Sequence, residues 1–212
     1  MYRLYYSPGA ASLAVHWMLI ELGVPFELEL IDTEAKQQKS PDYLALNPGG
    51  LVPTLMVDGA PMSESTAILM LLAERHAPDS LSLAPGSPGR AAYLQWMIYL
   101  ANTLLPAFRA WFYPDEPALA EASDAARGVA LDRIEAAWDR IDAQLAAAGP
   151  YLLGDTLTAA DFLAVMLMRW SRNMPKTAIA WPHIDAYLTR MRAMPSLRGV
   201  HAREGLTDWI DG

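Results

Sequence analysis

Residues 51–69, LVPTLMVDGAPMSESTAIL, decide the fold of this chain. Residues 54–57 predict a strand, the pair Asp58-Gly59 predicts a tight turn, and residues 60–62 predict a second strand. Residues 63–77 then carry the continuous pattern of a helix. A hairpin that runs directly into a helix predicts a small sheet covered by helices.

The residues before this stretch complete one small domain. Residues 2–6 are aromatic and branched, and residues 26–31 alternate apolar and acidic side chains, so both predict strands. Between them, residues 12–22 predict a helix that is packed on both sides, and Ser40-Pro41 begins a short helix that ends near residue 47. The order of elements predicts a mixed sheet with helices on its faces.

The rest of the chain predicts helices alone. Residues 79–88 are rich in Pro, Ser and Gly and predict a linker. Helices are expected at residues 90–112 (with a kink at Pro106), 117–148, 158–172, 181–194 and 195–204. The predicted fold class is an α/β domain (1–78) followed by an all-helical domain (89–212), with a small-ligand pocket at their junction.

Composition excludes several classes of protein. Of the 212 residues, 53% are hydrophobic and 19% are charged, which is typical of a folded chain rather than a disordered one. No apolar run reaches the roughly 18 residues of a membrane span, and the strand that begins at Tyr2 leaves no room for a signal peptide, so the cytoplasm is the expected location. A net charge of −8 without a basic stripe argues against nucleic-acid binding.

Cysteine and histidine usage limits the chemistry further. The chain has 0 Cys, which excludes a disulfide framework, a thiolate metal site and a cysteine nucleophile. Its 4 His, at positions 16, 76, 183 and 201, are far apart and lack metal-ligand spacing. We therefore expect no metal site, and we expect each histidine at the surface or at the edge of the core.

Val52-Pro53 is the first candidate binding feature. Proline has no N–H to donate, so it belongs at the start or edge of a strand. If this peptide bond is cis, the turn leaves the Val52 N–H and C=O free to pair with an extended, peptide-like ligand. The alternative is an ordinary trans proline in a loop.

Glu64-Ser65-Thr66 is the second feature, because it lies at the start of a helix. Unpaired N–H groups there bind an anion, and the Ser65 hydroxyl adds a donor. The Glu64 carboxylate suits a cation, so the pair suits an α-amino-acid head group. The alternative is a plain helix cap with an acidic first turn.

The turn between residues 6 and 12 is the third feature. A thiol at the helix start that follows it is ionised more easily, because its anion gains N–H bonds and dipole stabilisation. Tyr6, Ser7 and Ser12 each offer a hydroxyl there, although each could equally be a turn or cap residue.

These three features, in this order, resemble the glutathione transferase family, and the resemblance covers essentially the whole chain. Residues 5–13, YYSPGAASL, look most like the opening of the bacterial beta class. Residues 47–55 and 64–69 match the family's loop before its cis-proline and its γ-glutamyl segment. Residues 152–162, LLGDTLTAADF, match a second signature in the helical half.

The resemblance implies a thioredoxin-like first domain, a homodimer and a role in detoxification. It implies glutathione as co-substrate, with no other cofactor, and transfer of its thiolate to a small hydrophobic electrophile. The implied contacts of glutathione are Val52 beside a cis Pro53 for the cysteinyl backbone, Glu64 and Ser65 for the γ-glutamyl end, and Lys36 for the glycyl carboxylate.

The chain departs from the beta class at the sulfur site. Ala11 stands where that class has a cysteine, so thiol reductase activity through a mixed disulfide is not expected. Ile98 and Leu105 stand near where polar partners are found in that class. Stabilisation of the thiolate is then expected from Ser12, Tyr6 or Ser7.

A hydrophobic co-substrate site is expected from aromatic and basic residues of the helical half. The residues assigned to it are Ala11, Arg109, Trp111, Tyr113 and Trp170. Aromatic residues at helical spacing are also typical of a core. A non-catalytic protein that binds glutathione or a hydrophobic ligand, and a regulatory protein on the same scaffold, remain alternatives to the enzyme.

Thr158 and Asp161 have the spacing of a capping box at a helix start. This pattern predicts a role in folding rather than in catalysis.

Overall fold

The structure is a computed structural model that describes residues 1–114 and 123–211. Contacts divide the chain into two units, which are described separately. The first consists of Met1–Ala84 together with Met191–Gly212, and the second consists of Pro85–Arg190. The boundary at residues 84 and 85 lies inside the segment predicted as a linker.

The first unit contains a four-stranded mixed sheet in the order β2-β1-β3-β4. The strands are β1 (Tyr2–Tyr6), β2 (Phe26–Leu30), β3 (Thr54–Val57) and β4 (Ala60–Met62). β1 and β2 are parallel, with Tyr2 opposite Phe26, and β3 is antiparallel to both β1 and β4. This topology confirms the predicted thioredoxin-like domain.

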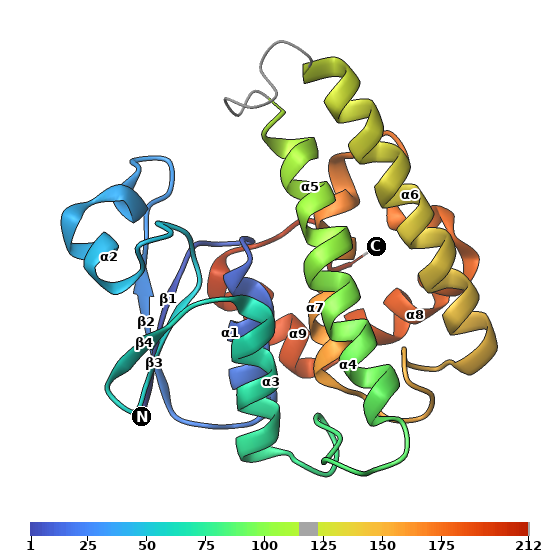
Figure 1. Ribbon diagram of the computed structural model, residues 1–212, viewed down its shortest axis with the longest axis horizontal. Helices are drawn as coiled ribbons and strands as arrows, with labels where there is room; N and C mark the ends of the chain where they lie inside the picture. The colour runs from blue at the N-terminus through green and yellow to red at the C-terminus, as the bar shows by residue number, and fades with distance from the viewer. Residues whose placement is uncertain (115–122, 212) are drawn as a thin grey trace. The chain divides into compact units, whose positions relative to one another are not determined.

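Helices cover both faces of this sheet (Figure 1). The helices of this unit are α1 (Ser12–Glu21), η1 (Gln37–Lys39), α2 (Pro41–Leu46), α3 (Ser65–His76) and α9 (Pro195–Glu204), the last of which packs on α1. α1 and α3 lie on one face and α2 lies on the other. α1 packs against β1, α3 and α9, and all its residues from Ser12 to Leu19 are buried, as expected of a helix packed on more than one side.

α9 joins the first unit although the sequence places it at the end of the helical domain. The Trp17 Nε1–H on α1 donates to the Ser196 hydroxyl on α9 at 2.9 Å. Leu197 and Val200 of α9 are buried. The chain therefore returns to its N-terminal unit after the second unit is complete.

This return corrects the prediction for two histidines. His16 and His201 are buried rather than at the surface or the core edge. His16 on α1 pairs with Glu204 on α9, and His201 Nδ1 lies 2.9 Å from the Leu197 carbonyl oxygen. The local sequence around His16 contains no sign of α9, which packs against α1.

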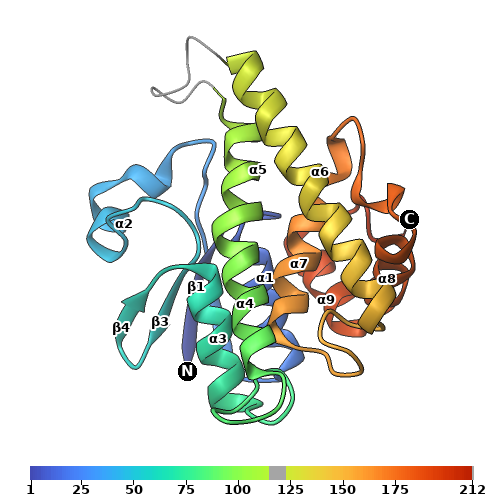
Figure 2. The same ribbon diagram turned by 45° about the vertical axis from the view of Figure 1, so that its right-hand side comes forward.

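In the described part of the second unit, the named elements are all helices, and the one β pairing is an isolated bridge between Tyr151 and Gly154. Its elements are α4 (Arg90–Tyr99), the π-helix η2 (Leu100–Leu104), α5 (Leu105–Phe112), α6 (Ser123–Ala148), α7 (Ala159–Trp170), η4 (Ser171–Asn173), η5 (Ala178–Ala180) and α8 (Pro182–Arg192). Figure 2 shows α5 and α6 side by side, with α4, η2 and α5 forming one continuous column. This arrangement confirms the predicted all-helical second half. The predicted helix start at residue 117 lies outside the described residues.

Pro106 affects the column in a specific way. It is the second residue of α5, which follows η2 directly. Because proline lacks an N–H, the carbonyl four residues earlier loses its α-helical donor, and a π-helical turn re-pairs the backbone at that point. The kink predicted at Pro106 therefore takes the form of a π-helical turn between two α-helices.

α7 is buried from Ala159 to Arg169 and begins with the predicted capping box. Asp161 accepts hydrogen bonds from the Thr158 N–H at 2.8 Å, the Leu152 N–H at 3.0 Å and the Tyr187 hydroxyl at 3.0 Å. The pKa of the Asp161 carboxyl is raised, because burial outweighs these hydrogen bonds.

None of the described helices has the length and hydropathy of a membrane span.

Candidate ligand-binding site

The Val52–Pro53 peptide bond is cis, which confirms the prediction. Pro53 is buried immediately before β3, while Val52 is only partly buried. The Val52 N–H and C=O make no hydrogen bond to any described residue. The main chain at Val52 therefore keeps a donor and an acceptor available to a ligand.

A group of polar side chains that sequence reasoning missed supports this edge. The Tyr43 hydroxyl and the Asn47 Nδ2–H each donate to the Leu51 carbonyl oxygen at 2.8 Å. The Thr54 hydroxyl lies 2.9 Å from the Tyr43 hydroxyl and accepts from Asn47 Nδ2 at 3.2 Å. Burial raises the pKa of Tyr43, so its hydroxyl remains a donor at neutral pH.

Glu64 and Ser65 form the start of α3. Glu64 has φ +71°, which is unusual for a residue with a side chain, and it is exposed. Ser65 is buried, and its hydroxyl donates to the Ala11 carbonyl oxygen at 3.1 Å. Backbone N–H groups at this helix start can therefore bind an anion. The Ser65 hydroxyl proton is already donated to the Ala11 carbonyl oxygen, so this hydroxyl does not supply the additional donor that the sequence predicted.

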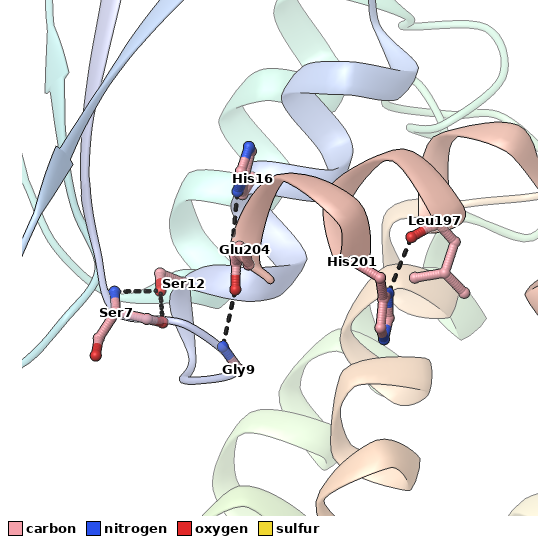
Figure 3. Close-up of polar contacts among 7 residues, drawn as sticks. All are labelled: Ser7, Gly9, Ser12, His16, Leu197, His201 and Glu204. Carbon is pink, nitrogen blue, oxygen red and sulfur yellow. Dashed lines mark hydrogen bonds and ion pairs between the residues drawn. The ribbon is translucent and has the colours of Figure 1, made fainter. Parts of the chain in front are cut away.

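The turn before α1 is closed by Ser12 (Figure 3). Its hydroxyl accepts from the Ser7 N–H at 3.2 Å and donates to the Ser7 carbonyl oxygen at 3.1 Å, and the side chain is fully buried. The Ser7 hydroxyl lies 3.1 Å from the Thr33 hydroxyl. Ser12 thus uses its only proton within the turn.

Tyr6 offers a different hydroxyl, which has no hydrogen-bond partner among the described residues. Its ring packs edge-on against His16, with the ring centroids 5.7 Å apart. Burial, and then the charge of Glu204, raises the pKa of Tyr6. Tyr6 is therefore suited to donating a proton in a hydrogen bond and unsuited to acting as a base near pH 7.

Glu204 is the second group that sequence reasoning missed. Its carboxylate accepts from the Gly9 N–H at 2.8 Å and lies 2.7 Å from His16 Nδ1, and both ionisable side chains are 0% exposed (Figure 3). Glu204 on α9 therefore fixes the backbone of the turn before α1, because it accepts the N–H of Gly9, which lies between Ser7 and Ser12. No local sequence signal links residues that are 195 positions apart.

Lys36 is exposed on the loop after β2 and has a left-handed backbone with φ +59°. The contacts that the structure records do not bring it to Val52 or Ser65.

In the part of the chain that the structure describes, no cluster of His, Cys, Asp and Glu suited to a metal ion is found.

The predicted co-substrate residues of the helical unit fall into separate contacts. The Arg109 guanidinium lies 5.0 Å from the centre of the Tyr113 ring, and Arg127 covers Trp111 at 5.7 Å. Trp170 instead packs edge-on against the rings of Phe108 at 5.8 Å and Phe112 at 6.1 Å. Ala11, the remaining member of this predicted set, belongs to the first unit.

Comparison with known proteins gives matches over most of the chain. Residues 10–75 match the family profile described as glutathione S-transferase, N-terminal domain, and residues 97–195 match glutathione S-transferase, C-terminal domain. Glutathione S-transferase GST-4.5 of Xanthomonas campestris pv. campestris is 34% identical over 208 residues, which cover 96% of this chain and 99% of that protein.

Solved structures agree with these matches. A sphingomonad glutathione S-transferase complexed with glutathione is 29% identical with a TM-score of 0.83, over 97% of this chain and 100% of that one. A bacterial beta class glutathione S-transferase of Sphingomonas chungbukensis is 27% identical with a TM-score of 0.84, over 97% of this chain and 100% of that one.

Proposed function

Because this chain belongs to the glutathione S-transferase family, close to the bacterial beta class, we propose that it transfers the thiolate of glutathione to a small hydrophobic electrophile. The observation that carries this proposal is the main-chain edge at Val52, which has an unpaired donor and acceptor beside the buried Pro53. Such an edge suits the extended backbone of a tripeptide.

In the proposed complex, glutathione lies along the first unit. Val52 pairs with its cysteinyl backbone through the N–H and C=O. The first N–H groups of α3, beginning at Ser65, bind the γ-glutamyl carboxylate, and Glu64 binds the ammonium group. The exposed Lys36 is assigned to the glycyl carboxylate.

The thiolate needs a hydroxyl donor, and the contacts of the turn favour Ser7 or Tyr6 over Ser12. The Ser7 hydroxyl lies 3.1 Å from the Thr33 hydroxyl, and when Thr33 donates in this contact the Ser7 proton remains for the sulfur. A hydrogen bond to an ion contributes about 1.5 to 3 kcal/mol. Since one pKa unit corresponds to about 1.4 kcal/mol, a single hydroxyl can lower the thiol pKa by roughly one to two units.

The electrophile is assigned to the predicted co-substrate residues, namely Ala11, Arg109, Trp111, Tyr113 and Trp170. Positioning it beside a bound thiolate accelerates the reaction mainly by proximity and by the lowered thiol pKa. A homodimer, a cytoplasmic location and a role in detoxification are part of the same proposal.

The test combines binding and turnover. Calorimetry should detect glutathione binding, glutathione should raise the melting temperature, and a generic aryl-halide electrophile should give conjugate above the uncatalysed rate. Absence of both heat and thermal shift at millimolar glutathione would contradict the proposal.

A glutathione-binding protein without catalytic activity is the second candidate. Two observations favour it, namely the absence of cysteine at position 11 and the internal use of the Ser12 hydroxyl proton. Tight glutathione binding without conjugation of several chemically different electrophiles is the result that selects this candidate.

A further inference from the structure

The loop from Asn47 to Thr54 contains a closed set of hydrogen bonds around one carbonyl group. The Leu51 carbonyl oxygen accepts from both Asn47 Nδ2 and the Tyr43 hydroxyl, each at 2.8 Å. Leu51 directly precedes Val52, so the orientation of this carbonyl also fixes the peptide plane that carries the Val52 N–H.

The directions of these bonds follow from proton counting. The Tyr43 hydroxyl has one proton and gives it to Leu51, so the Thr54 hydroxyl must donate in the 2.9 Å contact with Tyr43. Thr54 then accepts from Asn47 Nδ2 at 3.2 Å. The side chains of Asn47, Thr54 and Tyr43 and the Leu51 carbonyl therefore form a closed ring of hydrogen bonds. Leu51 precedes the Val52–Pro53 pair and Thr54 follows it, so the ring joins the two sides of this pair.

Asn47 makes more hydrogen bonds than the other two side-chain members of this ring. Besides its two donated bonds, its Oδ1 accepts from the Gly49 N–H at 3.0 Å, and its backbone carbonyl accepts from the Gly50 N–H at 2.9 Å. Gly50 has φ +57°, and a Cβ there would lie 2.9 Å from the Gln38 carbonyl oxygen. The segment from Asn47 to Gly50 is thus tightly held before the chain reaches Val52.

The burial of the ring separates it from any ligand. Tyr43 is 3% exposed, Asn47 is 7% exposed and Thr54 is 0% exposed. Val52, by contrast, is partly exposed and makes no backbone hydrogen bond to the described residues. The polar side-chain atoms of Tyr43, Asn47 and Thr54 are used within the ring and its loop, and the backbone donor and acceptor of Val52 are left for another molecule.

We infer that Asn47 and Tyr43 are positioning residues, which hold the Leu51 carbonyl and thereby set the Val52 main-chain edge on which the tripeptide binds. This inference rests on the proposed function. It assigns to the short helix α2 a role in glutathione affinity although none of the ring's side chains touches the ligand.

The test is a cycle that changes the protein and the ligand together. The probes are S-methylglutathione and the same compound methylated on its cysteinyl amide nitrogen. The methyl group replaces the ligand N–H and stands against the Val52 carbonyl, so the ligand backbone cannot approach closely enough for either hydrogen bond of the edge. The variants are Asn47→Ala, Tyr43→Phe and Thr54→Val, the last two being close in shape to the wild-type residues. Tyr2→Phe is the matched control, because the Tyr2 hydroxyl makes a 2.8 Å hydrogen bond to His76 at the other end of β1.

We expect Asn47→Ala and Tyr43→Phe each to weaken S-methylglutathione binding about tenfold, with a smaller loss for Thr54→Val and none for Tyr2→Phe. The methylated probe should bind wild type more weakly, and the variants should weaken it much less than tenfold, because its contact with the edge is already lost. In turnover, KM for glutathione should rise while kcat stays nearly constant. Any effect of methylation on the ligand itself cancels when each probe is compared across proteins.

Equal losses for the two probes, or unchanged affinity in the variants, would overturn the inference and leave the proposed function intact. If Asn47→Ala does not fold, Tyr43→Phe and Thr54→Val decide the outcome by the same comparison. Failure of wild type to bind S-methylglutathione would overturn the proposed function and this inference together.

Discussion

Ser7 and Ser12 carry the same functional group in one turn, but their hydroxyls have different surroundings. Ser12 is fully buried and both accepts from and donates to the backbone of Ser7. Ser7 shares its hydroxyl hydrogen bond with Thr33, which leaves one proton of the pair available. Residue type alone therefore does not decide which serine acts on a ligand.

Replacement of the two serines should separate these roles. Ser7→Ala should raise the pKa of glutathione bound to the protein by about one unit, since one hydrogen bond to the thiolate is lost. Ser12→Ala should instead lower the melting temperature and leave that pKa nearly unchanged. Thiolate absorbance followed against pH, with calorimetric melting of both variants, checks the pair, and reversed effects would assign the donor to Ser12.

Asp161 gives a prediction about pH. Its pKa is raised above 3.8 in the folded state by burial, so the folded protein holds this proton more tightly than the unfolded chain does. This contribution to stability is complete below about pH 3.8 and is lost as pH rises through the folded pKa. Asp161→Asn should remove that decline, so its free energy of unfolding should change less with pH than that of wild type.

Denaturant unfolding between mildly acidic and neutral pH measures this difference. Asp161→Ala is the companion variant, and it should cost about 2 to 4 kcal/mol because the Leu152 and Thr158 N–H groups lose a buried acceptor. Parallel stability profiles for wild type and Asp161→Asn would be the contrary result.

Among the elements, α9 shows how a distant helix completes the first unit. Glu204 at its end connects to α1 through His16 and to the preceding turn through Gly9. A buried carboxylate with two partners is expensive to remove, because both partners are left without their acceptor. α9 therefore acts on the turn that carries Ser7 as well as on the core.

Replacement of Glu204 should test this connection. Glu204→Ala should lower the free energy of unfolding by about 3 to 5 kcal/mol, and Glu204→Gln should cost less because its amide oxygen can still accept from Gly9. Glu27→Ala serves as the control, since Glu27 pairs with Arg3 at the surface and its side chain is 45% exposed. A loss no larger in Glu204→Ala than in Glu27→Ala would show that the buried pair contributes little.

At the scale of the whole molecule, the first unit is built from both ends of the chain. Residues 191–212 pack with residues 1–84, and the second unit occupies the sequence between them. The two family profiles match residues 10–75 and 97–195, and α9, which begins where the second match ends, packs against α1 of the first unit.

Removal of residues 191–212 should therefore destabilise the N-terminal half. Leu197 and Val200 are 1% and 0% exposed, and burial of each such side chain contributes about 1.5 to 3 kcal/mol. We expect residues 1–84 expressed alone to lack cooperative unfolding, and the chain truncated after Arg190 to lose more than about 3 kcal/mol. Circular dichroism with urea titration provides the measurement, and a natively folded 1–84 fragment would contradict the expectation.

The sequence by itself determined the main helices and strands and their order. Turn residues, helix periodicity and capping patterns act over a few neighbouring residues, which is why the hairpin at Asp58-Gly59, the start of α3 near Ser65 and the capping box at Asp161 were predicted correctly. The cis state of Pro53 was accessible only through resemblance, because isolated X–Pro bonds favour trans.

Only the tertiary structure decided which groups hold the site in place. The partners of Glu204, the burial of His16 and the ring through Asn47 depend on where helices pack, and the first of these joins positions 188 and 195 residues apart. Hydrogen bonds and burial depend on distance in space, whereas local sequence patterns report only on neighbours along the chain.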